Sequence, residues 1–215
     1  MERERSDRNY VSEVRADQAR RTRRRLVDAA VGLFVERGYA GTTIDAIAAA
    51  AGVSRKTVFD SVGGKAQLVK LAYDFAIVGD DEPVPLIDRQ EIAALNAEPD
   101  PAARIAAYAA MVVRIDVRIS PIWRVLESAA AHDAEAAELH AMLVEQRWTS
   151  MQGPAHMFAA RGELRPDLDV EDAAAVLWLA NDPSLFDKAV RQRGWSVERF
   201  QAWLTEITQV GLLGR

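Results

Sequence analysis

Hydrophobic residues in the first part of the chain recur with the spacing of one face of an α-helix. The stripe consists of Leu26, Ala29, Ala30, Leu33 and Phe34. We expect this helix to begin near Thr22 and to end at Gly38, since glycine adopts the left-handed conformation that ends helices. Residues 1–20 show no such periodicity and mix charges of both signs, so we predict a flexible basic arm there.

Three shorter helices are expected before residue 80. Thr43 is a good N-cap for the first of them, which ends where Gly52 permits a sharp reversal. Ser54 caps the next one, with Val58 on its inward side. A glycine pair, 63–64, then breaks the chain, and Lys65 opens a fourth helix.

The remainder of the chain also has helical patterns, and no strand alternation of convincing length occurs in it. Turn-rich stretches at 80–85 and 98–101 mark a boundary zone. Further helices are predicted at 101–119, 121–131, 134–161, 170–181 and 196–212, with weaker helical character at 183–192. The fold class is therefore all-α.

Composition narrows the possible chemistry. The chain has 215 residues, of which 49% are hydrophobic, and it contains no cysteine, so thiol catalysis and disulfides are excluded. It has no signal-like segment or long apolar run, so we expect a soluble cytoplasmic protein with no membrane partner. The three histidines lack the spacing of a metal site, and no catalytic motif is present. We expect no enzyme activity, metal or cofactor.

Charge is distributed unevenly along the chain. Residues 1–70 carry 14 Lys and Arg against 9 Asp and Glu, whereas residues 71–215 carry 13 against 23. A basic head attracts a polyanion and an acidic body is repelled by it, which favours nucleic-acid binding through the head. Surface solubilisation is the alternative explanation.

Two short helices joined by a tight glycine-containing turn are typical of a helix-turn-helix, whose second helix enters the major groove. Residues 38–48 and 51–59, with Lys65 beyond them, closely resemble the DNA-binding domain of the TetR family of transcriptional regulators. The resemblance covers about residues 22–72. It implies a three-helix DNA-binding head at 21–70 and a helical domain for ligand sensing and dimerisation at 71–215.

Arg55 and Lys56 lie in the first turn of the third helix, where the dipole disfavours cations by up to about 1 kcal/mol each. Contact with guanine edges or phosphates explains them, and two solvated basic residues are the alternative. The resemblance implies phosphate-positioning contacts from Thr42, Thr43 and Lys65. The expected DNA-binding residues are Arg23, Arg24, Thr42, Thr43, Ser54, Arg55, Lys56, Thr57, Phe59, Ser61 and Lys65.

The end of the third helix departs from the family pattern of Tyr-x-His/Tyr-Phe. Phe59 lacks the hydroxyl that family members direct at phosphate, and Ser61 replaces a longer donor. Asp60 would repel phosphate unless it accepts from cytosine or pairs with Lys56, one turn earlier. The arginines at 20–25 would compensate by following phosphates or entering a minor groove, or else form a solubilising tail.

The C-terminal body is expected to sense a small molecule and to form a homodimer. Polarizable and aromatic side chains suit a pocket for apolar ligands, although core packing explains each one singly. The candidate ligand-binding residues are Met111, Trp123, Met142, Trp148, Met151, His156, Phe158 and Trp178. Apolar faces of the last helices pack either inward or onto a second copy, and the family resemblance favours the second copy. The candidate dimer residues are Val176, Phe200, Trp203, Leu204 and Ile207.

The predicted function is that of a transcriptional regulator, a repressor that a small-molecule inducer releases from palindromic double-stranded operator DNA. The alternative is a protein of the same fold that has weak or no DNA binding and acts as a ligand-binding or interaction module. Asp60 and Ser61 keep this alternative open.

Overall fold

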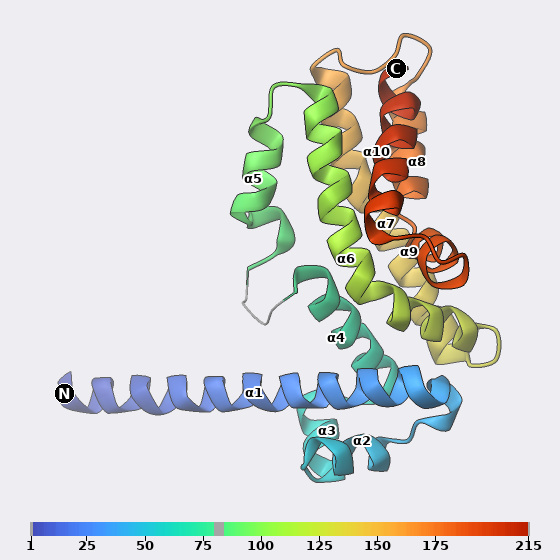
Figure 1. Ribbon diagram of the computed structural model, residues 1–215. Coiled ribbons are helices and arrows are strands. Elements are labelled where there is room, and N and C mark those ends of the chain that lie inside the picture. Colours follow the sequence, from blue (N-terminus) through green and yellow to red (C-terminus); the bar gives the residue numbers. More distant parts are fainter. Residues whose placement is uncertain (1, 80–83, 215) are drawn as a thin grey trace. The chain divides into compact units, whose positions relative to one another are not determined.

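The computed structural model describes residues 2–79 and 84–214, with side chains from Asp17 onward, and every regular element in these ranges is helical. The chain divides into two compact units, Met1–Phe75 and Ala76–Arg215 (Figure 1). This division lies a few residues beyond the boundary at 70 that the family resemblance implied.

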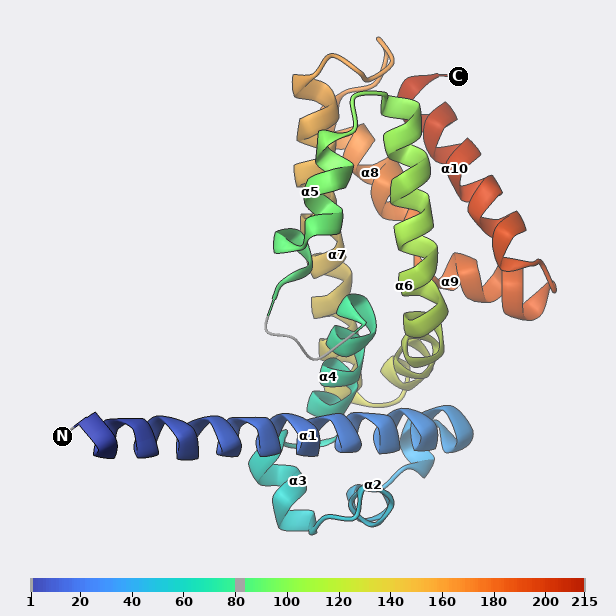
Figure 2. The same cartoon turned by 60° about the vertical axis from the view of Figure 1, so that its left-hand side comes forward.

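The first unit contains α1 (Glu2–Gly41), α2 (Ile44–Ala51), α3 (Arg55–Ser61) and the start of α4 (Lys65–Val78). Helices α2 and α3 lie together on one side of α1 in both views (Figures 1 and 2). Their core is built from the predicted stripe of α1, with Leu26, Ala30 and Phe34 fully buried. Ile47 of α2 and Val58 of α3 are likewise fully buried.

The N-terminal segment differs from the predicted arm, because its backbone is helical from Glu2 and continuous with the rest of α1. Glycine and proline are absent before Gly32, and Asp17 pairs with Arg20 and Arg21 one turn later. Such pairs at i+3 and i+4 support a helix without an apolar stripe. Gly38 interrupts α1 with φ 71° and ψ 173°, as its position predicted.

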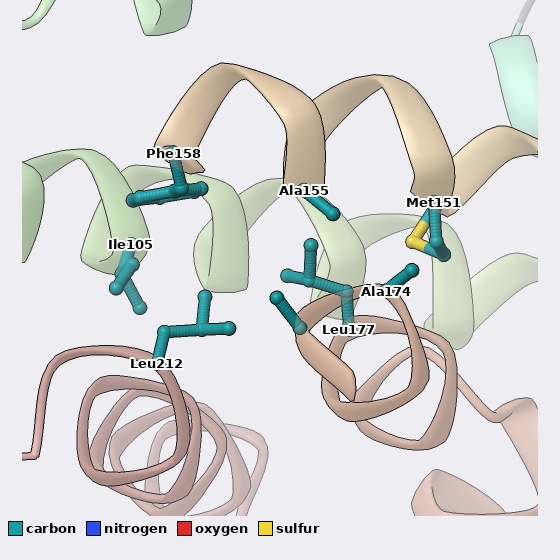
Figure 3. Packing of buried hydrophobic residues seen from close by; sticks show 8 residues of the cluster. Ile105, Met151, Ala155, Phe158, Ala174, Leu177 and Leu212 are labelled. Carbon is teal, nitrogen blue, oxygen red and sulfur yellow. The ribbon is translucent and has the colours of Figure 1, made fainter. Parts of the chain in front are cut away.

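The second unit is a bundle around two long helices, α6 (Pro101–Ala130) and α7 (Ala134–Ala160). Helix α8 (Val170–Ala180) packs on α7, and α10 (Val197–Leu213) packs on both α6 and α8. The remaining elements are η1 (Leu86–Asp88), α5 (Gln90–Ala97), α9 (Pro183–Phe186) and the π-helical η2 (Asp187–Gln192). Figure 3 shows one core of this unit, in which α6, α7, α8 and α10 all contribute side chains.

Helix α6 continues through Pro121, so the predicted break between residues 119 and 121 is wrong. Proline removes the hydrogen bond to the carbonyl four residues earlier, which belongs to Val117. The Val117 side chain is 43% exposed, so water has access to that side of the helix. Burial of the opposite side, at Ile119 and Ile122, holds the helix together across the missing bond.

Helix α5 was not predicted. It has no buried residue, and its few apolar side chains face a cavity, so the apolar stripe is too short to stand out. In the described ranges, no helix has the length and apolar character needed to cross a membrane.

Candidate functional site

The turn between α2 and α3 is fixed by local capping. The Thr43 hydroxyl accepts a hydrogen bond from the Ala46 N–H (3.1 Å). Gly52 has φ 65° and ψ 39°, and the following Val53 N–H donates to the Ala48 carbonyl (3.0 Å). This pattern satisfies the last carbonyls of α2 and reverses the chain. The predicted N-cap and glycine turn are confirmed.

Helix α3 presents its cationic first turn to solvent. Ser54 caps it by accepting from the Thr57 N–H (3.0 Å), and Val58 anchors its inner side. The side chains of Arg55 and Lys56 are 60% and 82% exposed. A short helix with a buried inner face and a cationic tip has the form required to enter a major groove.

Both cations already have acidic partners within the unit. Arg55 pairs with Asp45 of α2 (2.7 Å), and Lys56 pairs with Asp60 one turn later. The Arg55 guanidinium also lies 5.6 Å from the centre of the exposed Phe59 ring. Exposed ion pairs are worth about 0–1 kcal/mol, so phosphates or bases can replace these partners at little cost. As long as Lys56 stays paired with Asp60, its charge offsets the repulsion between this carboxylate and DNA.

Thr42 is an internal residue, so the predicted side-chain contact with DNA is wrong. Its side chain is 1% exposed, and its hydroxyl lies 2.8 Å from the Gly38 carbonyl and 3.1 Å from the Leu33 carbonyl. One of these carbonyls belongs to the last turns of α1 before its interruption, and the other belongs to Gly38, where α1 is interrupted. Thr42 therefore stabilises the turn at Gly38 rather than facing a ligand.

Lys65 makes a structural contact that the sequence did not predict. Its ammonium donates to the Tyr39 carbonyl (3.0 Å) and lies 4.2 Å from the centre of the Tyr39 ring. This contact ties the first turn of α4 to the end of α1, just after its interruption at Gly38. An ammonium has three donors, so a phosphate contact remains compatible with this geometry.

The other predicted DNA-binding residues all lie in the first unit. Arg23, Arg24, Thr43, Ser54 and Phe59 are exposed, whereas Thr57 and Ser61 are half-buried. The hydroxyls of Thr57 and Ser54 lie within hydrogen-bond distance of each other (2.8 Å).

The second unit has a partly open cavity of about 650 Å³ lined by η1, α5, α6 and α7, with Leu177 from α8. Three of the predicted ligand-binding residues line it, namely Met111, Met151 and Phe158. The size is typical of small-molecule sites. The sequence did not reveal the wall formed by Leu86, Ile87, Ile92 and Leu95, because η1 and α5 were not predicted.

The other five predicted ligand-binding residues do not line this cavity. Met142 is 46% exposed, and His156 is a surface residue whose Nδ1 lies 2.8 Å from the Gln152 carbonyl. Trp123 is buried in the bundle, and Trp148 contacts Trp178 edge to face at 6.1 Å. These three indole rings pack the core instead, which was the alternative explanation for each of them.

A buried cation lies next to these rings. The Arg147 guanidinium donates to the carbonyls of Trp178 (3.1 Å) and Asn181 (2.9 Å) and lies over the rings of Trp123 and Trp178. Burial raises the pKa of the nearby Asp116 carboxyl well above its usual value, although the charge of Arg147 opposes the shift. Arg147 therefore fixes the C-terminus of α8 against α7.

The predicted dimer residues fall into two groups. Phe200 and Leu204 are fully buried within one chain, and the Phe200 ring packs against Phe186 at 5.3 Å, so their assignment to a dimer surface is wrong. Val176, Trp203 and Ile207 are half-buried. The exposed apolar side chains of α8 and α10 are Leu179 (58%) and Val210 (50%), which the sequence pattern alone did not separate from the buried face.

Comparison with known proteins identifies the class. Residues 26–72 match the family described as bacterial regulatory proteins, tetR family. Over 106 residues the chain is 31% identical to the uncharacterized HTH-type transcriptional regulator TtgW of Pseudomonas putida, covering 49% of this chain and 69% of TtgW. It is 31% identical over 106 residues to the HTH-type transcriptional regulator SrpR of the same species, covering 49% of this chain and 44% of SrpR.

The fold extends the match beyond the helix-turn-helix. The crystal structure of NalD, the secondary repressor of the MexAB-OprM multidrug efflux pump in Pseudomonas aeruginosa, superposes with a TM-score of 0.63 at 22% identity. The superposition covers 89% of this chain and 96% of NalD. The chain belongs to the TetR family of transcriptional regulators, and its helix-turn-helix is a DNA-binding domain. Within the described residues, no group of three or more His, Asp or Glu side chains is arranged to hold a metal ion.

Proposed function

We propose that this protein is a ligand-responsive repressor that binds a palindromic operator as a homodimer and leaves it when a small molecule occupies the second unit. The outward-facing first turn of α3 carries the proposal, because Arg55 and Lys56 lie where a recognition helix contacts base edges. Arg55 would bond guanine O6 and N7, and Lys65 and the arginines before Leu26 would contact phosphates.

Dimerisation is supported by exposed apolar side chains on two adjacent helices. Leu179 on α8 and Val210 on α10 are each at least half exposed, and the half-buried Trp203 lies on the same α10 helix. Two recognition helices related by a twofold axis read half-sites one helical turn apart, which is the reason to expect a palindrome. The cavity against α5, α6 and α7 is the proposed inducer site.

The experiment is a gel shift of the full-length protein against a library of genomic fragments, followed by a salt titration of the retained fragments. We expect specific retention at low salt, with the logarithm of affinity falling by about 0.9 per log unit of salt for each phosphate neutralised. Arg55→Ala should relax base preference, whereas Arg24→Ala should weaken all sequences alike. Failure to retain any fragment specifically would contradict the proposal.

The second candidate function is an interaction or ligand-binding module with weak DNA affinity. It is supported by the acidic partners of both groove cations, Asp45 and Asp60, and by the absence of a phenolic hydroxyl at Phe59. Under this alternative, ligands would bind the second unit normally while no operator fragment is selected.

A further inference from the structure

The cavity in the second unit has an apolar body and one cationic end. The lining includes Asn96, Arg104 and Arg161 at the end where α7 stops and α5 ends. From Arg104, α6 runs along the wall to Met111, a rise of about 10 Å over seven residues. Among the described lining residues there is no carboxylate. A molecule lying along α6 would thus meet a cationic end and an apolar end.

The positive charge of Arg104 is already paired with a carboxylate of the same chain. Its side chain is 1% exposed, and it forms two bonds with the Glu163 carboxylate (2.5 and 3.0 Å). Two further bonds go to the Glu98 carbonyl (3.0 and 2.7 Å), and the guanidinium lies over the Phe158 ring. Removing this paired cation from its partners would be costly, so Arg104 forms part of the wall rather than a ligand contact.

Arg161 differs in both exposure and pairing. It is exposed at the end of α7, and its Nη2 donates to the Asn96 carbonyl (2.7 Å). Within the described part of the chain, no carboxylate forms an ion pair with it. The carboxylates of Glu98 and Asp100, which follow Asn96 in the chain, accept hydrogen bonds from the backbone N–H groups of Asp100 and Ala102. Only one of the five guanidinium N–H donors of Arg161 is used in this bond to Asn96, so the others remain available at the cavity.

The partial negative charge at the C-terminus of α7 is smaller than the positive charge of Arg161. Arg161 is the C-cap of α7, where the helix carries about half a negative charge spread over its last carbonyls. That partial charge stabilises the guanidinium in place and cancels at most part of its attraction for an anion. A planar guanidinium also binds a carboxylate through two parallel hydrogen bonds, which adds geometric specificity.

The apolar end would gain from an occupant. Ile87 lines the cavity yet is 71% exposed, and α5 has no buried residue. The Tyr108 hydroxyl, the polar group nearest the middle of the α6 wall, donates to the Met151 sulfur (3.2 Å). Removing such apolar surface from water is favourable, so this end selects hydrocarbon or aromatic groups.

We propose that the cavity binds an elongated apolar molecule with a single terminal carboxylate. Arg161 binds the carboxylate, and the apolar body lies along α6 toward Met111 and beneath Ile92 and Leu95 of α5. This inference rests on the proposed inducer site and specifies the chemical class of its ligand. Arg161 is the residue that discriminates acids from neutral and cationic molecules of the same length.

The test uses isothermal titration calorimetry of the full-length protein with decanoate, decan-1-ol and decyltrimethylammonium below their micelle concentrations. We expect decanoate to bind about tenfold more tightly than the alcohol, and the cation to bind most weakly. Arg161→Gln should lower decanoate affinity to that of the alcohol and leave the alcohol unchanged, while Arg161→Lys should retain most of the preference. Arg193→Gln, at an exposed arginine that does not line the cavity, is the matched control.

Equal affinity of native protein for acid and alcohol would overturn the inference, as would an undiminished acid preference in Arg161→Gln. The absence of binding by all three probes would overturn it as well. Each of these results leaves operator binding, measured separately by gel shift, free to support the proposed function. Conversely, a carboxylate preference without any retained operator fragment would sustain the ligand class and reject the repressor.

Discussion

Helices α8 and α10 are in such close contact at Gly211 that adding a single methyl group there should change the stability of the protein. A Cβ placed at Gly211 would lie 2.7 Å from Val176 Cγ1, whereas carbon atoms pack best at about 3.5–4.0 Å. Valine has one strongly preferred rotamer in a helix, so Val176 cannot turn aside cheaply. Gly211→Ala must therefore move α10 away from α8 by several tenths of an ångström.

Two opposing terms set the size of this effect. Alanine in place of a helical glycine stabilises by about 1 kcal/mol, while overpacking a well-packed contact costs about 1–3 kcal/mol. We expect Gly211→Ala to lower the free energy of unfolding by about 1 kcal/mol. In a Val176→Ala background the clashing carbon is gone, so the same substitution should raise it by about 1 kcal/mol.

The native protein, the two single variants and the double variant form a double-mutant cycle. Their free energies of unfolding can be measured by urea denaturation followed by tryptophan fluorescence, because all five tryptophans lie in the second unit. The four proteins would be compared at two concentrations to separate unfolding from dissociation of a dimer. A coupling free energy near zero between positions 176 and 211 would refute the reasoning, since it would mean that α8 and α10 are not in this close contact.

Three further outcomes are expected. Burial raises the pKa of Asp116 above its ordinary value of 3.8. The protonated carboxyl therefore contributes its full share of the free energy of unfolding below pH 3.8, and this contribution is lost as the pH rises through the raised pKa. Asp116→Asn should therefore exceed native stability in urea at pH 8 and lose this advantage at pH 4; identical pH dependence would contradict the shift. Phe59→Tyr should raise operator affinity about two- to tenfold for all sequences by adding a phosphate donor, measured by fluorescence anisotropy, and weaker binding would argue against proximity to phosphate. Thr42→Val should destabilise the first unit by about 1–3 kcal/mol while Thr42→Ser does not, as followed by circular dichroism, and equal melting of both would reject the role of the hydroxyl at the end of α1.

The features that the sequence predicted well depend on residues close together in the chain. The caps at Thr43 and Ser54 and the left-handed turn at Gly52 act within three or four positions, so their residue types alone indicate them. The exposure of Arg55 and Lys56 followed from the same local pattern. The pairing of Lys56 with Asp60 is also an effect of helical spacing.

The features that were missed depend on neighbours far away in the sequence. Phe200 and Leu204 lie on an apolar face of α10, and only the position of α6 and α9 decides that this face is buried within one chain. Thr42 is internal because carbonyls from α1 reach it, which its neighbours in the chain do not reveal. Arg161, the residue proposed to bind a carboxylate, has no distinctive pattern in the sequence, because its place beside the cavity depends on α5.

Helix α5 has consequences for how the second unit responds to an occupant. A helix that buries none of its residues has little packing of its own to resist local opening, so its backbone amides should exchange quickly with solvent. A bound molecule would supply the missing apolar contacts for Ile92 and Leu95, and part of its binding free energy would be spent in ordering the segment. Affinity for the cavity and hydrogen-exchange protection of residues 90–97 should therefore rise together across any series of ligands.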